Sequence, residues 1–225
     1  MNSSKYTAII IEPRKHKALH FVLDNFLKGL TDDWNIIIFH GTENELFVKD
    51  IIKNFEESYI KRIKLINLKV NNLTIKEYNQ LLLNTKFYEF IPTETFLIFQ
   101  TDTLILNKEK INNFLDYDYV GAPWNHKPFN IDVSVGNGGL SLRKKSKMLE
   151  ILNNIPYQGQ PEDLYFCSNK TIKIHKPSFE EAKNFSVEEV FFEQPFGCHK
   201  PWNRYHSNIF FNLYPQVKEL YNLNV

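Results

Sequence analysis

The chain has 225 residues, 43% of them hydrophobic, which is enough for one α/β domain that buries about 70% of its unfolded surface. Its 27 basic and 26 acidic residues leave a net charge of +1, which argues against a protein-wide field for nucleic acid or an anionic membrane. The two cysteines match no metal or disulfide pattern, and no signal segment or run of about 18 apolar residues is present, so we expect a soluble cytoplasmic protein without a transmembrane segment.

The first half of the chain alternates strand and helix patterns. The stretches YTAIIIE, WNIIIFHG, IKLINLKV and TFLIFQTD predict strands, and HKALHFVLDNFLKGL, LFVKDIIKNF and IKEYNQLLLN predict helices. This alternation predicts a mostly parallel sheet with right-handed crossovers, in which ligands bind at the carboxyl ends of the strands. We therefore expect one crevice bordered by the polar residues at those ends, namely Glu12, Arg14, His40, Gly41 and Asp102.

A carboxylate interrupts the apolar stretch FLIFQTDTLIL, residues 96–106. A buried, unpaired carboxylate is costly to desolvate, so the strand either ends at Asp102 in a cleft or supplies that residue with partners. Either outcome places a site near Asp102.

The second half is rich in Gly, Pro and aromatic residues. In VGNGGLSLR, the glycines Gly136, Gly138 and Gly139 permit positive φ or the close approach of another group, and a tight turn and a ligand-binding backbone are both open. LSLRKKSKMLEILNN predicts a short strand that enters a helix. We interpret its basic cluster LRKKSK as a solvated face.

An acidic pair stands in QPEDLYF. Glu162 and Asp163 follow a proline, so they are typical of a helix N-terminus, where they complement the helix dipole. A carboxylate that faces a cleft there also suits general-base catalysis on a hydroxyl nucleophile.

The stretch PFGCHKPWN combines groups that suit an anionic ligand. Lys200 offers a positive charge to phosphate, His199 can bind metal or phosphate, and Trp202 can form a wall. The alternative is a surface loop anchored by the tryptophan. We favour ligand binding, because folding does not require this lysine.

The ordered motifs LIFQTD, GAPW, GNGGLSLR, ED and HKPW resemble a glycosyltransferase-like family with the GT-A fold, and the resemblance extends from IIIEPR to HKPW. It implies a single α/β, GT-A-like (Rossmann-like) domain over residues 1–225, with a mostly parallel central sheet flanked by helices. Residues 1–106 would form the nucleotide-binding half and residues 107–225 the acceptor and catalytic half.

The resemblance also implies a donor site. Gln100, Thr101 and Asp102 are similar to the DxD motif that holds a divalent cation on the donor diphosphate, with the first acid replaced. QPFGCHKPW is similar to the HxxGxxKPW motif of family 8 enzymes, with Gln194 at the histidine position. The implied metal ligands are Asp102 and His199. The implied donor-binding residues are Glu12, Arg14, Gln100, Thr101, Asp102, Gly138, Gly139, Lys200 and Trp202.

Both replaced ligands are glutamines, and this weakens the expected metal site. Mn²⁺ and Mg²⁺ favour charged oxygen ligands, so an amide in place of a carboxylate lowers metal affinity. Two alternatives remain open. His199 and the donor diphosphate support a weakly bound cation, or Lys200 and Arg14 bind the diphosphate without metal.

The resemblance implies transfer of a sugar from a nucleotide-sugar, with a UDP-sugar favoured, to a glycan or another hydroxyl acceptor. We expect Asp163 to be the base of an inverting reaction with Glu162 beside it, whereas family 8 enzymes retain configuration. A non-catalytic sugar-nucleotide or glycan-binding module is the second class, which the two glutamines support. A nucleotidyltransferase ranks third. Such enzymes usually have a glycine-rich basic loop near the N-terminus, whereas IIIEPRKHK is basic but contains no glycine.

Overall fold

The computed structural model describes residues 4–203 and 207–225. Its main sheet has six strands in the order β3-β2-β1-β4-β7-β6. The pairs β3-β2, β2-β1 and β1-β4 are parallel, and β7 runs antiparallel to β4 and β6. The strands are β1 (Tyr6–Ile11), β2 (Trp34–His40), β3 (Ile63–Asn67), β4 (Thr95–Phe99), β6 (Tyr119–Pro123) and β7 (Val135–Lys144). The predicted mostly parallel sheet of an α/β fold is thus confirmed.

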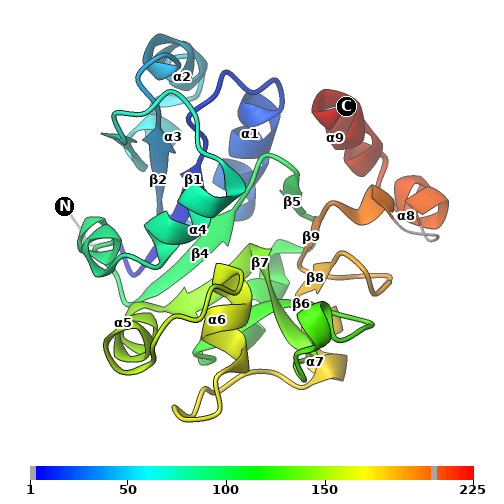
Figure 1. Ribbon diagram of the computed structural model, residues 1–225. Coiled ribbons are helices and arrows are strands. Elements are labelled where there is room, and N and C mark those ends of the chain that lie inside the picture. Colours follow the sequence, from blue (N-terminus) through cyan, green and yellow to red (C-terminus); the bar gives the residue numbers. More distant parts are fainter. Residues whose placement is uncertain (1–3, 204–206) are drawn as a thin grey trace.

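A second sheet of three short strands lies beside the main one, in the order β5-β9-β8 (Figure 1). These strands are β5 (Thr103–Ile105), β8 (Ser186–Val187) and β9 (Gly197–His199). β9 pairs antiparallel with β5 and parallel with β8. The stretch FGCHK, for which a surface loop was one alternative, is therefore largely a buried strand.

Helices cover both faces of the main sheet. The α-helices are α1 (Leu19–Gly29), α2 (Glu45–Ile52), α3 (Glu57–Ile60), α4 (Ile75–Leu82), α5 (Lys145–Asn154), α6 (Glu162–Ser168), α7 (Phe179–Lys183), α8 (Ser207–Leu213) and α9 (Pro215–Asn224). The short 3₁₀ helices are η1 (Thr85–Phe90), η2 (Lys108–Phe114), η3 (Pro128–Asn130) and η4 (Pro201–Asn203). All seven elements predicted in the first half form close to their expected positions.

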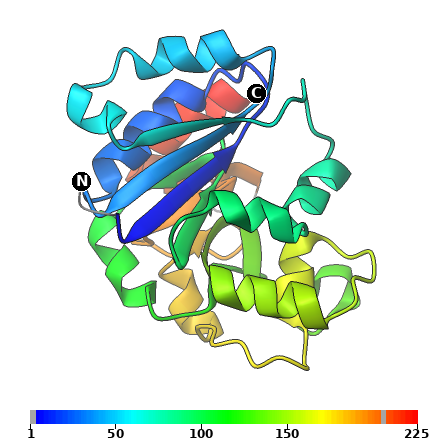
Figure 2. The same ribbon diagram turned by 90° about the vertical axis from the view of Figure 1, so that its left-hand side faces the viewer.

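Alternate residues of the strands supply two separate cores. On one face, Ile10, Ile38 and Leu97 pack with α1, α2, α8 and α9. On the other, Ile9, Ile37 and Ile98 pack with α4, η1, α5 and α6. Figure 2 shows β1 and β2 side by side in blue, with the red α9 close to α1. Both faces are buried because parallel strands joined by helical crossovers are covered on both sides.

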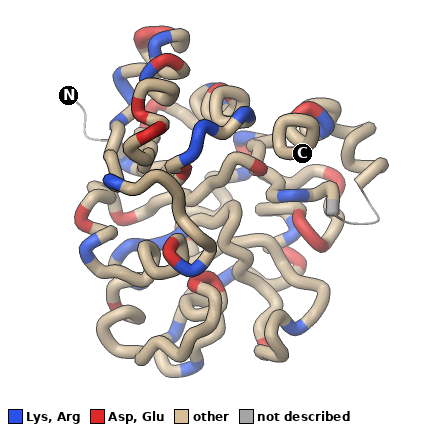
Figure 3. The backbone as a smooth tube through the Cα atoms, turned by 45° about the horizontal axis from the view of Figure 1, so that its top comes forward, with Lys and Arg blue, Asp and Glu red and all other residues tan. Residues whose placement is uncertain are grey.

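Lys and Arg are interspersed with Asp and Glu along the backbone, as Figure 3 shows. Within residues 4–203 and 207–225, no helix combines the length and apolar character needed to cross a membrane.

Candidate functional site

A cavity of about 490 Å³ opens at the carboxyl ends of β1 and β4. The loop before α4, the middle of β7, the start of α6 and the end of β9 complete its walls. Eleven of the twelve site residues expected from the sequence line it, namely Glu12, Arg14, Gln100, Thr101, Asp102, Gly138, Gly139, Glu162, Asp163, His199 and Lys200.

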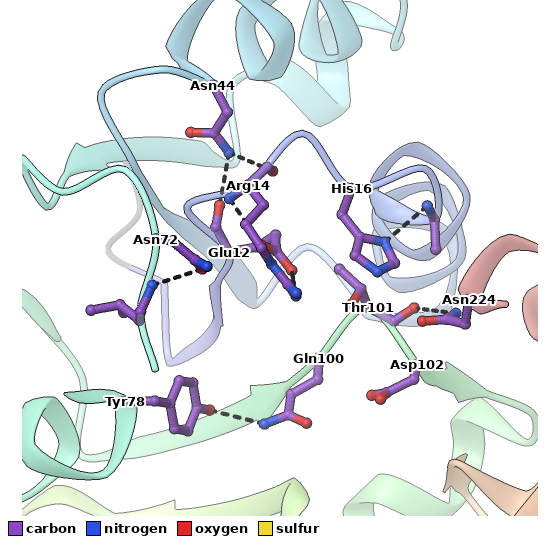
Figure 4. A network of polar contacts seen from close by, with 12 residues as sticks. Glu12, Arg14, His16, Asn44, Asn72, Tyr78, Gln100, Thr101, Asp102 and Asn224 are labelled. Carbon is purple, nitrogen blue, oxygen red and sulfur yellow. Dashed lines mark hydrogen bonds and ion pairs between the residues drawn. The ribbon is translucent and has the colours of Figure 1, made fainter. Parts of the chain in front are cut away.

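An arginine–glutamate pair forms the wall after β1 (Figure 4). The buried Glu12 carboxylate accepts from the Arg14 Nε at 2.8 Å, from Nη2 at 2.8 Å and from the Arg14 backbone N at 2.9 Å. Asn44 fastens the loop by donating to the carbonyls of Glu12 and Arg14. The Glu12 hydrogen bond raises the pKa of Arg14, so this half-exposed guanidinium remains a cation beside the cavity.

Asp102 lies where β4 ends. The strand stops at Phe99, and a turn follows in which the Thr103 hydroxyl donates to the Gln100 carbonyl at 2.7 Å. The chain then enters β5 in the other sheet. Asp102 is 7% exposed, and its Oδ2 lies 3.1 Å from Lys200 Nζ. Both expectations for this residue therefore hold, because Asp102 stands at a cleft and has a charged partner.

Two neighbours of Asp102 are also fastened (Figure 4). Gln100 Nε2 donates to the Tyr78 hydroxyl at 3.2 Å, and the Thr101 carbonyl accepts from Asn224 Nδ2 at 3.0 Å. The DxD-like segment is thus held between α4 and α9.

Lys200 is directed to the cavity by an unusual backbone conformation. Its φ is 44°, a left-handed value that side-chain-bearing residues seldom adopt and that costs about 1 kcal/mol or more. Its backbone N donates to the Asp102 carbonyl at 3.1 Å, so both backbone and side chain contact the same residue. The ammonium remains about half exposed, and a ligand in the cavity can reach it.

His199 lies between two carboxylates. Its Nε2 is 3.4 Å from Asp102 Oδ1, and its Nδ1 is 3.3 Å from Glu188 Oε2. Burial alone lowers the pKa of His199, but the charges of Glu188 and Asp102 raise it above the ordinary value. Gly139 packs on the ring, since a Cβ at that position would lie 2.2 Å from the ring carbon Cε1. A glycine is required there by the imidazole.

The two expected metal ligands, Asp102 and His199, are neighbours at the cavity. No group of three or more His, Cys, Asp or Glu side chains suited to a metal ion occurs in the described part of the chain. Asp102 Oδ1 and both His199 ring nitrogens are nevertheless buried without a hydrogen-bond partner among the described residues. Asp102 Oδ1 and His199 Nε2, which lie 3.4 Å apart, are close enough to serve as two ligands of one divalent cation.

Asp163 stands at the start of α6 with its carboxylate against β7. It accepts hydrogen bonds from the backbone N of Gly138 at 3.2 Å and of Leu164 at 2.8 Å. Burial, followed by the charge of Glu162, raises its pKa to about 6. A carboxylate with a pKa near the working pH suits proton transfer.

Glu162, beside it, is committed to a partner. The Arg143 guanidinium donates Nη1 to Glu162 Oε2 at 2.6 Å and Nη2 to Oε1 at 2.9 Å. Arg143 is 0% exposed, and it also donates from Nε to Ser141 Oγ at 3.0 Å and lies over the Tyr119 ring. The interpretation of LRKKSK as a solvated face is therefore wrong for Arg143, because this residue belongs to the buried strand β7.

Some expected residues do not line the cavity. Trp202 lies in η4 and packs edge-on against Tyr221 of α9, at 5.7 Å between ring centroids. Gln194, at the histidine position of the family 8 motif, is exposed, and its carbonyl accepts from Lys110 Nζ. His40 is buried with its Nδ1 2.8 Å from the carbonyl of Gly41. The expected crevice thus forms around Glu12, Arg14 and Asp102, but His40 and Gly41 at the end of β2 do not line it.

Three residues that shape the site were not predicted from the sequence, namely Tyr78, Arg143 and Glu188. Arg143 had a usable signal, because it is a charged residue in the predicted strand LSLR, as Asp102 is a charged residue within the apolar stretch FLIFQTDTLIL. Tyr78, in IKEYNQ, and Glu188, in FSVEEVFF, belong to no motif that marks them as site residues. Only the packing of α4 and β8 brings them to the cavity or its edge.

Comparison with solved structures shows the same fold. The galactosyltransferase LgtC, in complex with donor and acceptor sugar analogues, matches over 93% of this chain and 95% of its own, with a TM-score of 0.54 and 12% identity. GlyE, a glycosyltransferase of Streptococcus pneumoniae, matches over 96% and 62%, with a TM-score of 0.52 and 14% identity. The mannosyltransferase PcManGT of Pyrobaculum calidifontis, bound to GDP-Man and Mn²⁺, matches over 71% and 49%, with a TM-score of 0.50 and 15% identity.

The sequence comparisons give the family. A model described as "Protein of unknown function (DUF5672)" matches residues 62–199, more than half of the chain, and the protein belongs to this family. The matched region includes Asp102, the acidic pair and His199. No curated protein sequence matches.

Proposed function

We propose that the protein is a glycosyltransferase that moves a sugar from a nucleotide-sugar, with a UDP-sugar favoured, to a hydroxyl acceptor with inversion of configuration. The observation that carries this proposal is the set of charged side chains that line one cavity. It holds two cations, Arg14 and Lys200, and a carboxylate, Asp163, whose pKa is raised to about 6. The resemblance to glycosyltransferases in fold supports the same class.

In this proposal the donor diphosphate binds at Lys200 and Arg14, and Glu12 keeps the guanidinium in place. Gln100, Thr101, Gly138 and Gly139 supply the adjoining surface. The charge that develops on the leaving diphosphate is stabilised by fixed cations in a partly enclosed site. A divalent cation held by Asp102 and His199 would neutralise further charge on the diphosphate.

The acceptor hydroxyl gives its proton to Asp163 as it attacks the anomeric carbon. The Gly138 N–H and the start of α6 hold the Asp163 carboxylate at its place in the cavity wall. Glu162, engaged by Arg143, acts as a positioning residue in this scheme. The residues that bind the donor in this proposal come from both predicted halves of the chain, because Lys200 belongs to residues 107–225.

The proposal is tested first by donor binding. Purified protein is heated with UDP-, GDP-, CMP- and dTDP-sugars, with and without Mn²⁺, and its Tm is recorded. A ligand at 100 times its Kd stabilises the native state by about 2.7 kcal/mol, so one nucleotide class should raise Tm selectively. If no nucleotide-sugar raises the Tm of the wild-type protein, the proposal fails.

Release of free nucleotide from that donor, with and without candidate acceptors, then measures turnover. The anomeric configuration of the product, determined by NMR, separates inversion from retention. Asp102→Asn should lose turnover while its own Tm is maintained. Asp50→Asn, on the exposed side of α2, is the matched control. Selective donor binding without any turnover would point to the binding-module alternative.

A further inference from the structure

The small sheet brings Asp102, His199 and Glu188 close together. His199 ends the central strand β9, and Thr103, which follows Asp102, pairs with it on β5. On the other side, Val187 of β8 pairs with Cys198, so the next residue, Glu188, comes level with His199. Figure 1 shows β5, β9 and β8 lying together at the edge of the main sheet. Neighbouring strands lie about 4.8 Å apart, which brings side chains on either side within reach of the imidazole.

The ring is held in one orientation. Asp102 Oδ1 lies 3.4 Å from Nε2, and Glu188 Oε2 lies 3.3 Å from Nδ1. The backbone of Gly139 lies against the ring and restricts its movement. All four atoms at these two contacts are buried, and none has a hydrogen-bond partner among the described residues. Buried polar atoms without partners are rare in native proteins and require an explanation.

A neutral imidazole has one N–H group and one lone pair. If Nδ1 carries the proton, its N–H points toward Glu188 Oε2. The Nε2 lone pair then faces Asp102 Oδ1. Two electron-rich atoms that face each other in this way call for a cation. Carboxylates beyond a metal-bound histidine commonly fix its tautomer and orientation in this manner.

We infer that Glu188 is a positioning residue for a divalent-cation site whose protein ligands are His199 Nε2 and Asp102 Oδ1. This inference rests on the proposed function, because two protein ligands are too few, and the donor diphosphate would supply further oxygens. It assigns a task to a residue outside the cavity lining.

The test measures Mn²⁺ binding by the full chain in the presence of UDP, with free Mn²⁺ followed by electron paramagnetic resonance. Asp102→Asn and His199→Gln should remove the binding site. Glu188→Gln should weaken Mn²⁺ binding by about 10- to 100-fold, the range for loss of such a partner. Glu188→Asp keeps the charge and should recover part of the affinity.

Glu189→Gln is the matched control, since it makes the same change one residue further along, where the carboxylate lies 2.9 Å from Nδ1 of His126. It should bind Mn²⁺ as the wild type does. Tm is recorded for every variant, so that affinity per folded molecule is compared. With Cd²⁺ as a diamagnetic probe, ¹⁵N NMR of labelled histidines should show His199 metal-bound at Nε2 and protonated at Nδ1.

Equal Mn²⁺ affinity for the wild type and Glu188→Gln would overturn the inference, as would binding that survives Asp102→Asn. Absence of any Mn²⁺ binding by the wild type would overturn it too and would indicate an imidazolium that pairs with both carboxylates. Sugar transfer measured in EDTA is independent of these results, so the proposed function can stand while this inference fails.

Discussion

Two arginine–glutamate pairs border the cavity, and they differ in burial rather than in chemistry. Glu12 and Arg14 form a bidentate pair after β1, where the arginine side chain is 55% exposed. Glu162 and Arg143 form another between β7 and α6, where the arginine is 0% exposed. The exposed pair can offer its cation to a ligand. The buried pair has no such freedom, and it fixes the helix start that carries Asp163.

The sharpest test of this division concerns the acid that the buried pair positions. Asp163→Asn should lower sugar transfer by about 10²- to 10⁴-fold, the range for loss of a general base, while donor binding changes little. Rate and donor affinity are measured separately by initial velocities and calorimetry. Wild-type transfer by this variant would refute the inverting mechanism.

The two arginines should contribute clearly different amounts to the free energy of unfolding of the protein. Arg143→Met leaves the buried Glu162 carboxylate without its partner and should destabilise the fold by about 3–5 kcal/mol. Arg14→Met removes a half-exposed guanidinium, and the buried Glu12 carboxylate keeps only the hydrogen bond from the backbone N of residue 14, so this change should cost less, about 1–2 kcal/mol. Urea unfolding gives both values. The double variant Arg143→Met/Glu162→Gln should recover much of the loss, whereas equal costs for the two single variants would erase the distinction.

On the exposed side, Lys200→Ala should weaken nucleotide-sugar binding by about 1.5–3 kcal/mol, as expected for a lost charge-assisted hydrogen bond. Lys200→Gly separates charge from backbone strain. It should lose the same affinity but unfold less readily than Lys200→Ala, because glycine adopts the φ of 44° freely. Unchanged donor affinity in both variants would show that Lys200 does not bind the donor.

The smallest expected effect is a shift in pH dependence. The pKa of Asp163 is raised to about 6, so its base form, and with it the transfer rate, should fall as pH drops below about 6. Glu162→Gln removes a negative charge that raises this pKa. The acid limb of its rate profile should therefore move to lower pH, although burial, the larger cause, still holds the pKa above its ordinary value. An unmoved limb would show that Glu162 does not tune Asp163.

The same pKa has a consequence for stability, with a defined sign. A raised folded-state pKa favours the native state below the unfolded-state value of 3.8, and this contribution is lost as pH rises through about 6. Ionised Asp163 therefore costs stability at pH 8. Asp163→Asn should unfold at higher urea than the wild type at pH 8, and the difference should shrink toward pH 4.

The sheet was predictable because its signals are local. Apolar runs and helical spacing depend on residues a few positions apart, and a crevice at the strand ends follows from the parallel order. Asp102 was found in the same way, since a carboxylate in a buried stretch is a local contradiction. Arg143 obeys the same rule, but the lysines after it made LRKKSK resemble a solvated cluster.

The remaining site depends on contacts between distant segments, which local patterns do not reveal. Trp202 is part of the KPW signature, yet it packs against Tyr221 of α9 and does not line the cavity. Glu188 becomes a neighbour of His199 only through the pairing of β8 with β9. Gly139 needs no side chain because an imidazole from a later strand lies against it.

The central position of β9 in the small sheet has a consequence for how the protein is made. Lys200 and His199 reach Asp102 only when β9 lies between β5 and β8, and β9 follows every strand of the main sheet in the chain. A domain generally folds as a unit, so the site can form only after β9 has been synthesised. We therefore expect a nascent chain stalled before residue 197 to lack donor binding, because the strand that carries His199 and leads to Lys200 is then missing from the small sheet.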